Sequence, residues 1–268
     1  MISINTNQGS LFASKAAGAA QKTLNTAMER LSSGSRINSA KDDAAGQGIA
    51  TRITAQIEGL NMASRNAADA QAMIDTAEAA HQEVHSMLLR MRELAVQAAN
   101  GTLGTADNAA LNEEINALEK EIKSISDNTT FAGKNINTSM QTVFQVGTAS
   151  SNTLTVIFKD FDTSAIGADV GVTTADTARD ALTKIDAAIS TISTRRGELG
   201  AASNRLSSVI ANLDNISVNL ASARGRIQDT DFAVETSNLA RSQIMQQAAT
   251  AMLAQANASK QTVLALIQ

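Results

Sequence analysis

The sequence predicts a mainly α-helical protein: an elongated α-helical coiled-coil bundle in which the terminal helices pair, with a small β-hairpin region in the middle. Three observations predict this fold class. The chain of 268 residues contains no Pro and has long stretches without Gly. Apolar residues recur at heptad spacing through these stretches. One short segment in the middle of the chain contains two runs rich in β-branched residues, close to each other. Because both helix breakers are missing, helices well beyond the usual length are permitted.

The two ends of the chain are expected to form helices that pair with each other. On the N-terminal side, Leu24, Met28 and Leu31 share one helical face. Near the C-terminus, an apolar and Ala-rich face consists of Ile244, Met245, Ala248, Met252, Ala256, Val263 and Leu266. A single isolated helix of this kind is marginal in water, so a partner is needed.

Both ends are also poor in charge. Residues 1–28 carry only two charged side chains, and residues 236–268 again carry only two. Frayed termini are one interpretation of such ends. The regular apolar spacing favours the other interpretation, in which both ends are buried in partners.

Between the ends, the sequence predicts long rod helices with apolar seams. A helix from about Asp43 to Ala99 would span roughly 85 Å at the α-helical rise. Its seam repeats every seventh residue, at Ile53, Leu60, Ala67, Ile74, His81, Leu88 and Ala95. A shorter seam covers residues 111–125. A third seam follows the same period, at Ile185, Ile192, Leu199, Leu206, Leu213, Leu220, Ile227 and Val234. The series three residues later, which is the second register of this seam, includes one conspicuous charge, Arg195.

Residues 130–175 interrupt the helices. We expect Gly133 to end the preceding helix. The runs Thr142–Val146 and Leu154–Phe158 flank a turn segment rich in Gly, Ser and Asn, which predicts a β-hairpin.

These elements divide the chain into four parts. Residues 1–42 and 229–268 are the N-terminal and C-terminal parts of one helical layer. Residues 43–185 hold the N-terminal rod helices, the hairpin and a short variable middle, and residues 186–228 form the C-terminal rod helix.

Composition and motifs give no support for an enzyme. Without Cys there is no disulfide, thiolate zinc site or cysteine nucleophile. His81 and His85 share a helical face, but the Glu that follows the first His in metalloprotease helices is absent, so one seam His and one surface His are the favoured interpretation. We predict no catalytic residues, no metal and no cofactor.

Charge and hydropathy exclude two classes of partner. A net charge of −4 lacks the basic footprint of a nucleic-acid binder. No apolar run reaches the length of a membrane span, so no membrane partner is expected. The start of the chain has neither the basic nor the apolar part of a secretory signal peptide, and general rules alone would place such a protein in the cytosol.

Four longer motifs resemble the signatures of bacterial flagellins. Residues 27–46 and 92–102 resemble the N-terminal signature, and residues 224–233 and 246–257 resemble the C-terminal one. The match covers roughly residues 1–135 and 185–268. It departs from the family at Lys260, where a Pro is usual, at Ser35, where a Leu is common, and at His81, where an apolar residue is common.

The resemblance implies a subunit that polymerises with itself into the flagellar filament, the helical propeller for swimming motility. It implies that both termini form the inner helical layer of the filament, and that a core-only chain such as this one has no large outer domain. The residues assigned to filament assembly on that layer are Leu24, Met28, Leu31, Ile244, Met245, Met252, Val263 and Leu266.

The resemblance also implies location and partners. The family is extracellular and is exported without a cleavable signal peptide, which replaces the cytosolic expectation. Implied partners are the flagellar cap and hook-junction proteins, a cytoplasmic export chaperone at the C-terminal helix 241–268, and a host flagellin-sensing receptor of innate immunity. The positions matching the receptor segment are Arg90, Leu94 and Glu114, although Arg90 and Glu114 are equally interpreted as a charge-paired helical surface.

Two alternatives to a filament subunit stay open at this point. One is a flagellin-like hook–filament junction protein, whose ends would match the signatures less closely. The other is a helical signalling or scaffold coiled coil, against which the paired terminal signatures and the lack of a membrane span argue.

Overall fold

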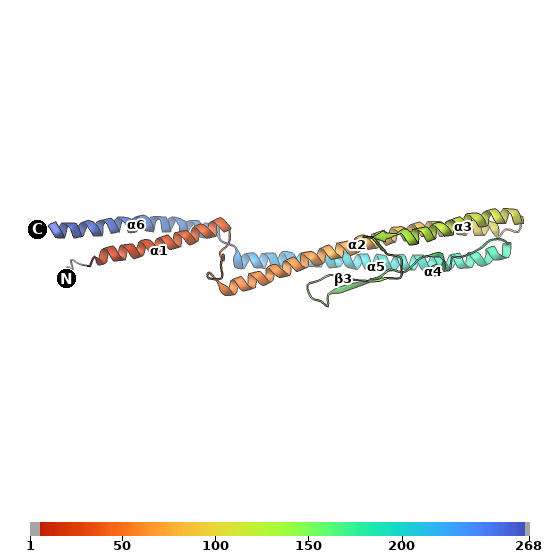
Figure 1. The fold of residues 1–268 in the computed structure, drawn as a ribbon, viewed down its shortest axis with the longest axis horizontal. Coiled ribbons are helices and arrows are strands. Elements are labelled where there is room, and N and C mark those ends of the chain that lie inside the picture. Colours follow the sequence, from red (N-terminus) through yellow and green to blue (C-terminus); the bar gives the residue numbers. More distant parts are fainter. Residues whose placement is uncertain (1–5, 266–268) are drawn as a thin grey trace. The chain divides into compact units, whose positions relative to one another are not determined.

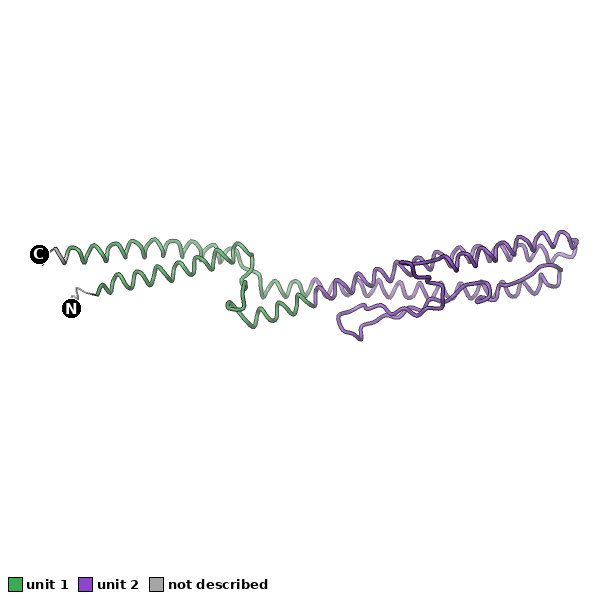
Figure 2. Tube along the Cα trace, in the orientation of Figure 1, with its two compact units in different colours: residues 1–55, 219–268 green, residues 56–218 purple. Residues whose placement is uncertain are grey.

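The structure, a computed structural model, describes residues 6–265 and divides into two compact units. Unit 1 comprises residues 1–55 and 219–268, and unit 2 comprises residues 56–218 (Figure 2). Two long helices, α2 (Ala44–Ala98) and α5 (Ala175–Gln228), contribute residues to both units. Within residues 6–265, none of the helices combines the length and the apolar character that crossing a membrane requires.

Unit 1 contains the terminal helices α1 (Gln8–Ser33) and α6 (Phe232–Ala265), which lie side by side (Figure 1). Asn7 caps α1 by accepting a hydrogen bond from the backbone N–H of Ser10 at 3.1 Å. Gly34 ends the helix in the left-handed conformation, with φ of 69°, that favours glycine. The predicted pairing of the terminal helices is therefore confirmed.

The segments that follow α1 and precede α6 are joined to each other by backbone hydrogen bonds. The N–H of Thr230 donates to the carbonyl of Gly34 at 2.9 Å, and the N–H of Arg36 donates to the carbonyl of Gln228 at 2.6 Å. Ser35 and Asp229 form an isolated antiparallel bridge between these donors. The segment that leaves α1 and the segment that enters α6 are thus hydrogen-bonded to each other next to the end of the α1–α6 pair.

Unit 2 is built on the antiparallel packing of α2 and α5, with α3 (Thr105–Asn128) added to it. The seam predicted from the heptads is buried in this unit: Ile74, Leu88, Ile185, Ile192 and Leu206 are each at most 1% exposed. Burying a side chain of this size contributes about 1.5–3 kcal/mol. Hydrophobic burial along these seams is therefore the main force that holds unit 2 together.

The middle of the chain forms the predicted hairpin with its strands one residue earlier than expected. Strands β3 (Gln141–Gln145) and β4 (Thr153–Ile157) pair antiparallel, with Val143 opposite Thr155. Leu154 and Val156 of β4 are buried in the core of unit 2, whereas the alternate residue Ile157 is exposed. A Cβ on Gly59 of α2 would lie 2.8 Å from the methyl carbon of Thr148, so glycine permits the hairpin loop to approach the helix closely.

Elements in three places differ from the prediction or were not anticipated. Helix α3 ends at Asn128, before Gly133, which instead lies with φ of 78° in the turn between β1 (Thr130–Phe131) and β2 (Lys134–Asn135). The short helix α4 (Thr163–Ile166) was not predicted. Helix α5 begins at Ala175, ahead of the boundary drawn at residue 186.

Candidate functional site

The contact between α1 and α6 is made by small residues. On α1 these are Ala13, Ala20 and Ala27, spaced by seven and at most 6% exposed. On α6, Ala249 occupies the same kind of position, and a Cβ on Gly9 would lie only 3.4 Å from the Cβ of Ala256. Small side chains allow the two helix backbones to approach closely, and they remove little apolar area from water.

Polar side chains fix the antiparallel register of this pair. Asn7 donates to the carbonyl of Ala256 at 3.0 Å near the open end of the pair, and Gln246 donates to the side-chain oxygen of Gln21 at 2.5 Å in its middle. Near the other end, Arg30 lies 3.8 Å from Glu235, which is 8% exposed. These contacts cross from one helix to the other at three separate points along it.

Beside these contacts, α1 and α6 form a groove of about 610 Å³. Its lining combines small residues with charge: Ala16, Thr23, Arg30, Glu235, Arg241 and Met245 are among its residues. The Nε of Arg30 is buried there and has no hydrogen-bond partner among the described residues. The groove is therefore not filled by the side chains of unit 1 itself.

Large apolar side chains of the terminal helices are left exposed to solvent. We call these eight residues of α1 and α6 the exposed apolar set: Leu11 (62% exposed), Phe12 (73%), Met28 (55%), Phe232 (56%), Val234 (55%), Ile244 (65%), Met245 (53%) and Met252 (66%). This exposed apolar set is therefore the candidate site of protein–protein interaction on the terminal helices.

The residues assigned to assembly from the sequence fall partly within this set. Met28, Ile244, Met245 and Met252 belong to it, while Leu24 and Leu31 are half-buried. Leu266 lies outside the described residues, as does the side chain of Val263. Met28, Ile244, Met245 and Met252 therefore face solvent, whereas the most buried apolar residues of the α1–α6 contact are the Ala residues at heptad spacing.

Sequence reasoning did not assign four members of the set to assembly: Leu11, Phe12, Phe232 and Val234. A signal for the first two was present, because Leu11 and Phe12 lie in the charge-poor stretch 1–28. Val234 was placed at the end of the third heptad seam, but it is 55% exposed, because α5 ends at Gln228 and Val234 belongs to α6.

The rod-seam residues lie where the heptads place them. Leu60, Leu199 and Leu213 are at most 7% exposed, and Leu206 is fully buried in the same unit. Towards the ends of α2 and α5, Ile53, Leu220 and Ile227 are only half-buried. The seam is therefore tightest in unit 2 and looser in the parts of the two helices that belong to unit 1.

The structure brings two of the three receptor-segment residues together. Arg90 on α2 donates from Nε and Nη2 to one carboxylate oxygen of Glu114 on α3, at 3.0 and 2.8 Å. The hydrogen bond with Glu114, followed by that with Glu93, raises the pKa of Arg90. Leu94 is instead 2% exposed, within the core of unit 2. Arg90 and Glu114 thus form a surface ion pair, whereas Leu94 is a core residue.

The two histidines do not belong to a larger group of ligands. His81 is 2% exposed in the seam, and His85 is half-buried. Among the described residues, no three His, Asp or Glu side chains come together in a group able to hold a metal ion.

Two family models match this chain. The model of the bacterial flagellin N-terminal helical region matches residues 4–142. The model of the bacterial flagellin C-terminal helical region matches residues 182–267. Together they include α1, α6 and nearly all of the two long helices.

Full-length relatives agree with the family models. The chain is 46% identical over 247 residues to a flagellin of Halalkalibacterium halodurans, covering 90% of this chain and 91% of that one. It is 40% identical over 280 residues to a flagellin of Bacillus subtilis, with the same coverage of both chains. It is 33% identical over 377 residues to flagellin A of Vibrio cholerae, covering all of both chains.

Solved structures show the same architecture. The crystal structure of Bacillus cereus flagellin matches with a TM-score of 0.52 and 32% identity, covering 60% of this chain and 94% of that one. A structure assigned as a flagellar hook-associated protein from Vibrio parahaemolyticus matches with a TM-score of 0.62, covering 70% of this chain and all of that one. At 16% identity, the second likeness shows a shared fold alone.

Proposed function

The chain belongs to the bacterial flagellin family and is a subunit of the extracellular flagellar filament, and from that premise we propose that α1 and α6 carry the surface through which subunits polymerise. Flagellins are structural proteins, and we assign no catalytic role to this one. The identity of 46% over most of both chains also favours a filament subunit over a hook–filament junction protein or a signalling coiled coil.

The observation that carries the proposal is the contrast between the two faces of the terminal helices. Their mutual contact is made by Ala side chains, whereas the exposed apolar set projects Phe12 (73% exposed) and Met252 (66% exposed) away from it. Fully burying one such side chain contributes about 1.5–3 kcal/mol. Neighbouring subunits that cover this set would therefore gain far more from it than α1 and α6 gain from each other.

This arrangement couples the ordering of the terminal helices to assembly. Helices whose own contact buries little apolar area are only marginally stable in water. They gain stability when a neighbouring subunit covers them, as segments that fold on binding do. Polymerisation and completion of the fold are then one event.

The same exposed surface supports the proposed export chaperone. Before assembly, α6 presents Ile244, Met245 and Met252 to solvent, each more than half exposed. A cytoplasmic partner that covers these residues would prevent premature association. We further propose export without a cleavable signal peptide and contacts with cap and hook-junction proteins, which rest on family membership.

A host receptor is proposed at the pair Arg90–Glu114. These side chains are about half exposed, so they are available on a free subunit. Leu94 is buried and would act by holding the helix surface rather than by touching a receptor.

Deleting residues 236–268 tests the polymerisation surface. We expect a soluble monomer that keeps the helices of unit 2, measured by circular dichroism, and forms no filaments by negative-stain electron microscopy. The full chain, treated identically, serves as the control and forms filaments. Filaments of normal width and length from the truncated chain would contradict the proposal.

A further inference from the structure

His81 lies in the seam of unit 2 under an aromatic ring. It is 2% exposed, and its ring centroid is 4.7 Å from that of Phe161, with an edge-on angle of 62° between the planes. Phe161 is itself fully buried in the core of unit 2. An ionisable ring thus occupies a seam position among apolar neighbours.

The hydrogen bonds of His81 define its protonation state. Its Nδ1 lies 2.6 Å from the carbonyl oxygen of Ala77, and a carbonyl oxygen only accepts hydrogen bonds. The proton of the neutral ring is therefore on Nδ1. The other ring nitrogen, Nε2, is buried without a hydrogen-bond partner among the described residues. A second proton would have to enter at Nε2, where nothing accepts it.

The charges near the ring come from α2 and α5. Arg195 and Arg196 of α5 oppose a positive charge on His81, and Glu78 of α2 favours one. Arg196 is already paired with Glu78, at 2.6 and 3.0 Å. Burial is the largest effect and lowers the pKa of His81 below its ordinary value of 6.5. His85, one turn along α2, has a buried Nδ1 without a partner among the described residues.

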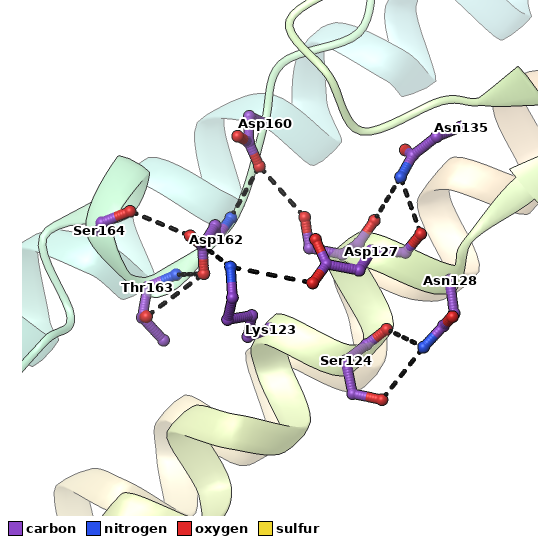
Figure 3. A network of polar contacts seen from close by, with 10 residues as sticks. Lys123, Ser124, Asp127, Asn128, Asn135, Asp160, Asp162, Thr163 and Ser164 are labelled. Carbon is purple, nitrogen blue, oxygen red and sulfur yellow. Dashed lines mark hydrogen bonds and ion pairs between the residues drawn. The ribbon is translucent and has the colours of Figure 1, made fainter.

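Residues 158–162 form a strap over this position, and the strap is attached by polar contacts at its edges. Arg195 donates to the carbonyl oxygen of Asp160, and Lys159 pairs with Glu198 of α5 at 2.8 Å. From α3, Ser126 donates to the carboxylate of Asp160 at 3.1 Å, and Lys123 lies 3.5 Å from Asp162 (Figure 3).

Phe161 of the strap lies against the ring of His81, and Phe158 at its start is buried in the adjoining core of unit 2, while Lys159, Asp160 and Asp162 make the polar contacts. Movement of Phe161 would admit water to Nε2 without breaking the heptad contacts of α2 with α5 on either side. Opening of the strap removes Phe161 and then Phe158 from the core and leaves the heptad contacts of α2 with α5 in place, so the strap can open locally.

We propose that His81 is a proton-triggered latch: protonation at Nε2 expels Phe161 from the seam and releases the strap 158–162 from unit 2. Burying an imidazolium whose new N–H has no acceptor costs free energy, and hydration of that N–H relieves the cost. The latch lies in unit 2 and goes beyond the role of α1 and α6 in polymerisation.

The dependence of stability on pH follows from the difference between the pKa of His81 in the folded and in the unfolded chain. Because the folded pKa of His81 is below that of the unfolded chain, the neutral ring contributes stability that is fully present above about pH 6.5. This stability is lost as the pH falls towards and through the folded pKa. Strap opening should thus begin in mildly acidic solution, above the range in which ordinary carboxylates become protonated.

The chain has only two histidines, so both imidazoles can be followed by NMR on the full-length monomer. We expect His81 to titrate below 6.5. Hydrogen exchange at Phe158, whose N–H donates to the Met140 carbonyl at 2.8 Å, reports on the strap. Its rate, corrected for intrinsic exchange, should increase by up to about tenfold for each unit by which the pH is lowered. This holds in the pH window where His81 is protonated only when the strap is open.

Two variants separate the latch from general acid unfolding. His81→Leu should make the corrected exchange at Phe158 independent of pH between 7.5 and 5, and His85→Gln should behave like the parent chain. A pKa of His81 at or above 6.5 in the parent chain would overturn the proposal. So would corrected exchange at Phe158 that stays flat as His81 titrates. If His81→Leu does not fold, the titration and exchange of the parent chain still decide the matter.

Discussion

Arg196 of α5 donates two hydrogen bonds, from Nε at 3.0 Å and Nη2 at 2.6 Å, to a single carboxylate oxygen of Glu78 on α2. The two side chains are about one third exposed. The pair lies beside the buried seam rather than within it, and it joins α2 to α5.

Breaking this pair should weaken unit 2 only modestly. For Arg196→Gln we expect a loss of about 0.5–1 kcal/mol in the free energy of unfolding, because solvent screens a partly exposed pair. Denaturant unfolding of the monomer followed by circular dichroism measures it. Arg179→Gln, which breaks a more exposed pair with Asp176 inside one helix, is the matched control and should cost less. A loss of several kcal/mol from Arg196→Gln would contradict this ranking.

The buried seam should dominate stability. Leu206→Ala removes a fully buried side chain and is expected to lower the free energy of unfolding by about 2–5 kcal/mol. Val218→Ala, at a position 68% exposed on the same helix, should change it by less than about 0.5 kcal/mol. Equal effects of the two substitutions on the denaturation midpoint would argue against a seam at the heptad positions.

Glu119 should reduce stability as the pH rises. Burial raises the pKa of Glu119 above its ordinary value of 4.5, although its carboxylate accepts a hydrogen bond from the N–H of Val170 at 2.8 Å. A carboxyl whose folded pKa is raised binds protons more tightly in the folded state, so stability falls as the pH rises through and above 4.5.

Neutralising Glu119 separates its charge from its hydrogen bond. Glu119→Gln keeps an acceptor for Val170 and should be as stable as the parent chain or more stable at pH 7, with the difference vanishing near pH 4. Glu119→Ala loses the acceptor and should be less stable than Glu119→Gln at both pH values. Thermal unfolding at the two pH values measures this, and a destabilised Glu119→Gln at pH 7 would count against the role of burial.

The heptad pattern was sufficient to place the seam of unit 2, because large branched residues at a fixed period have one way to be buried together. It was not sufficient for the terminal helices. There, both large and small apolar residues recur, and the close approach of α1 to α6 selects Ala20 and Ala27 for the contact. Which face pairs within a subunit depends on backbone separation, which a single sequence does not specify.

Local features outside the helices show the same limit. The hairpin was predicted to within one residue because its two runs and turn are local in sequence. Strands β1 and β2 have two residues each, too short to produce a pattern. Arg195 looked like a misplaced charge in the second register of the seam, and its partner, the carbonyl of Asp160, is reached only through the tertiary fold.

Polymerisation through the exposed apolar set is tested most directly by site-specific labelling. The chain contains no Cys, so a single Met252→Cys substitution introduces one reactive thiol at a position 66% exposed in the monomer. The variant is copolymerised as a minority with the parent chain, so that filaments still form. Thr173→Cys, at an exposed position in the short middle segment, is the matched control.

We predict that maleimide reacts with Met252→Cys in the monomer and at least about tenfold more slowly in the filament, because a neighbouring subunit must open before the thiol is reached. Thr173→Cys should react at similar rates in both states. Equal labelling of Met252→Cys in monomer and filament would contradict the account.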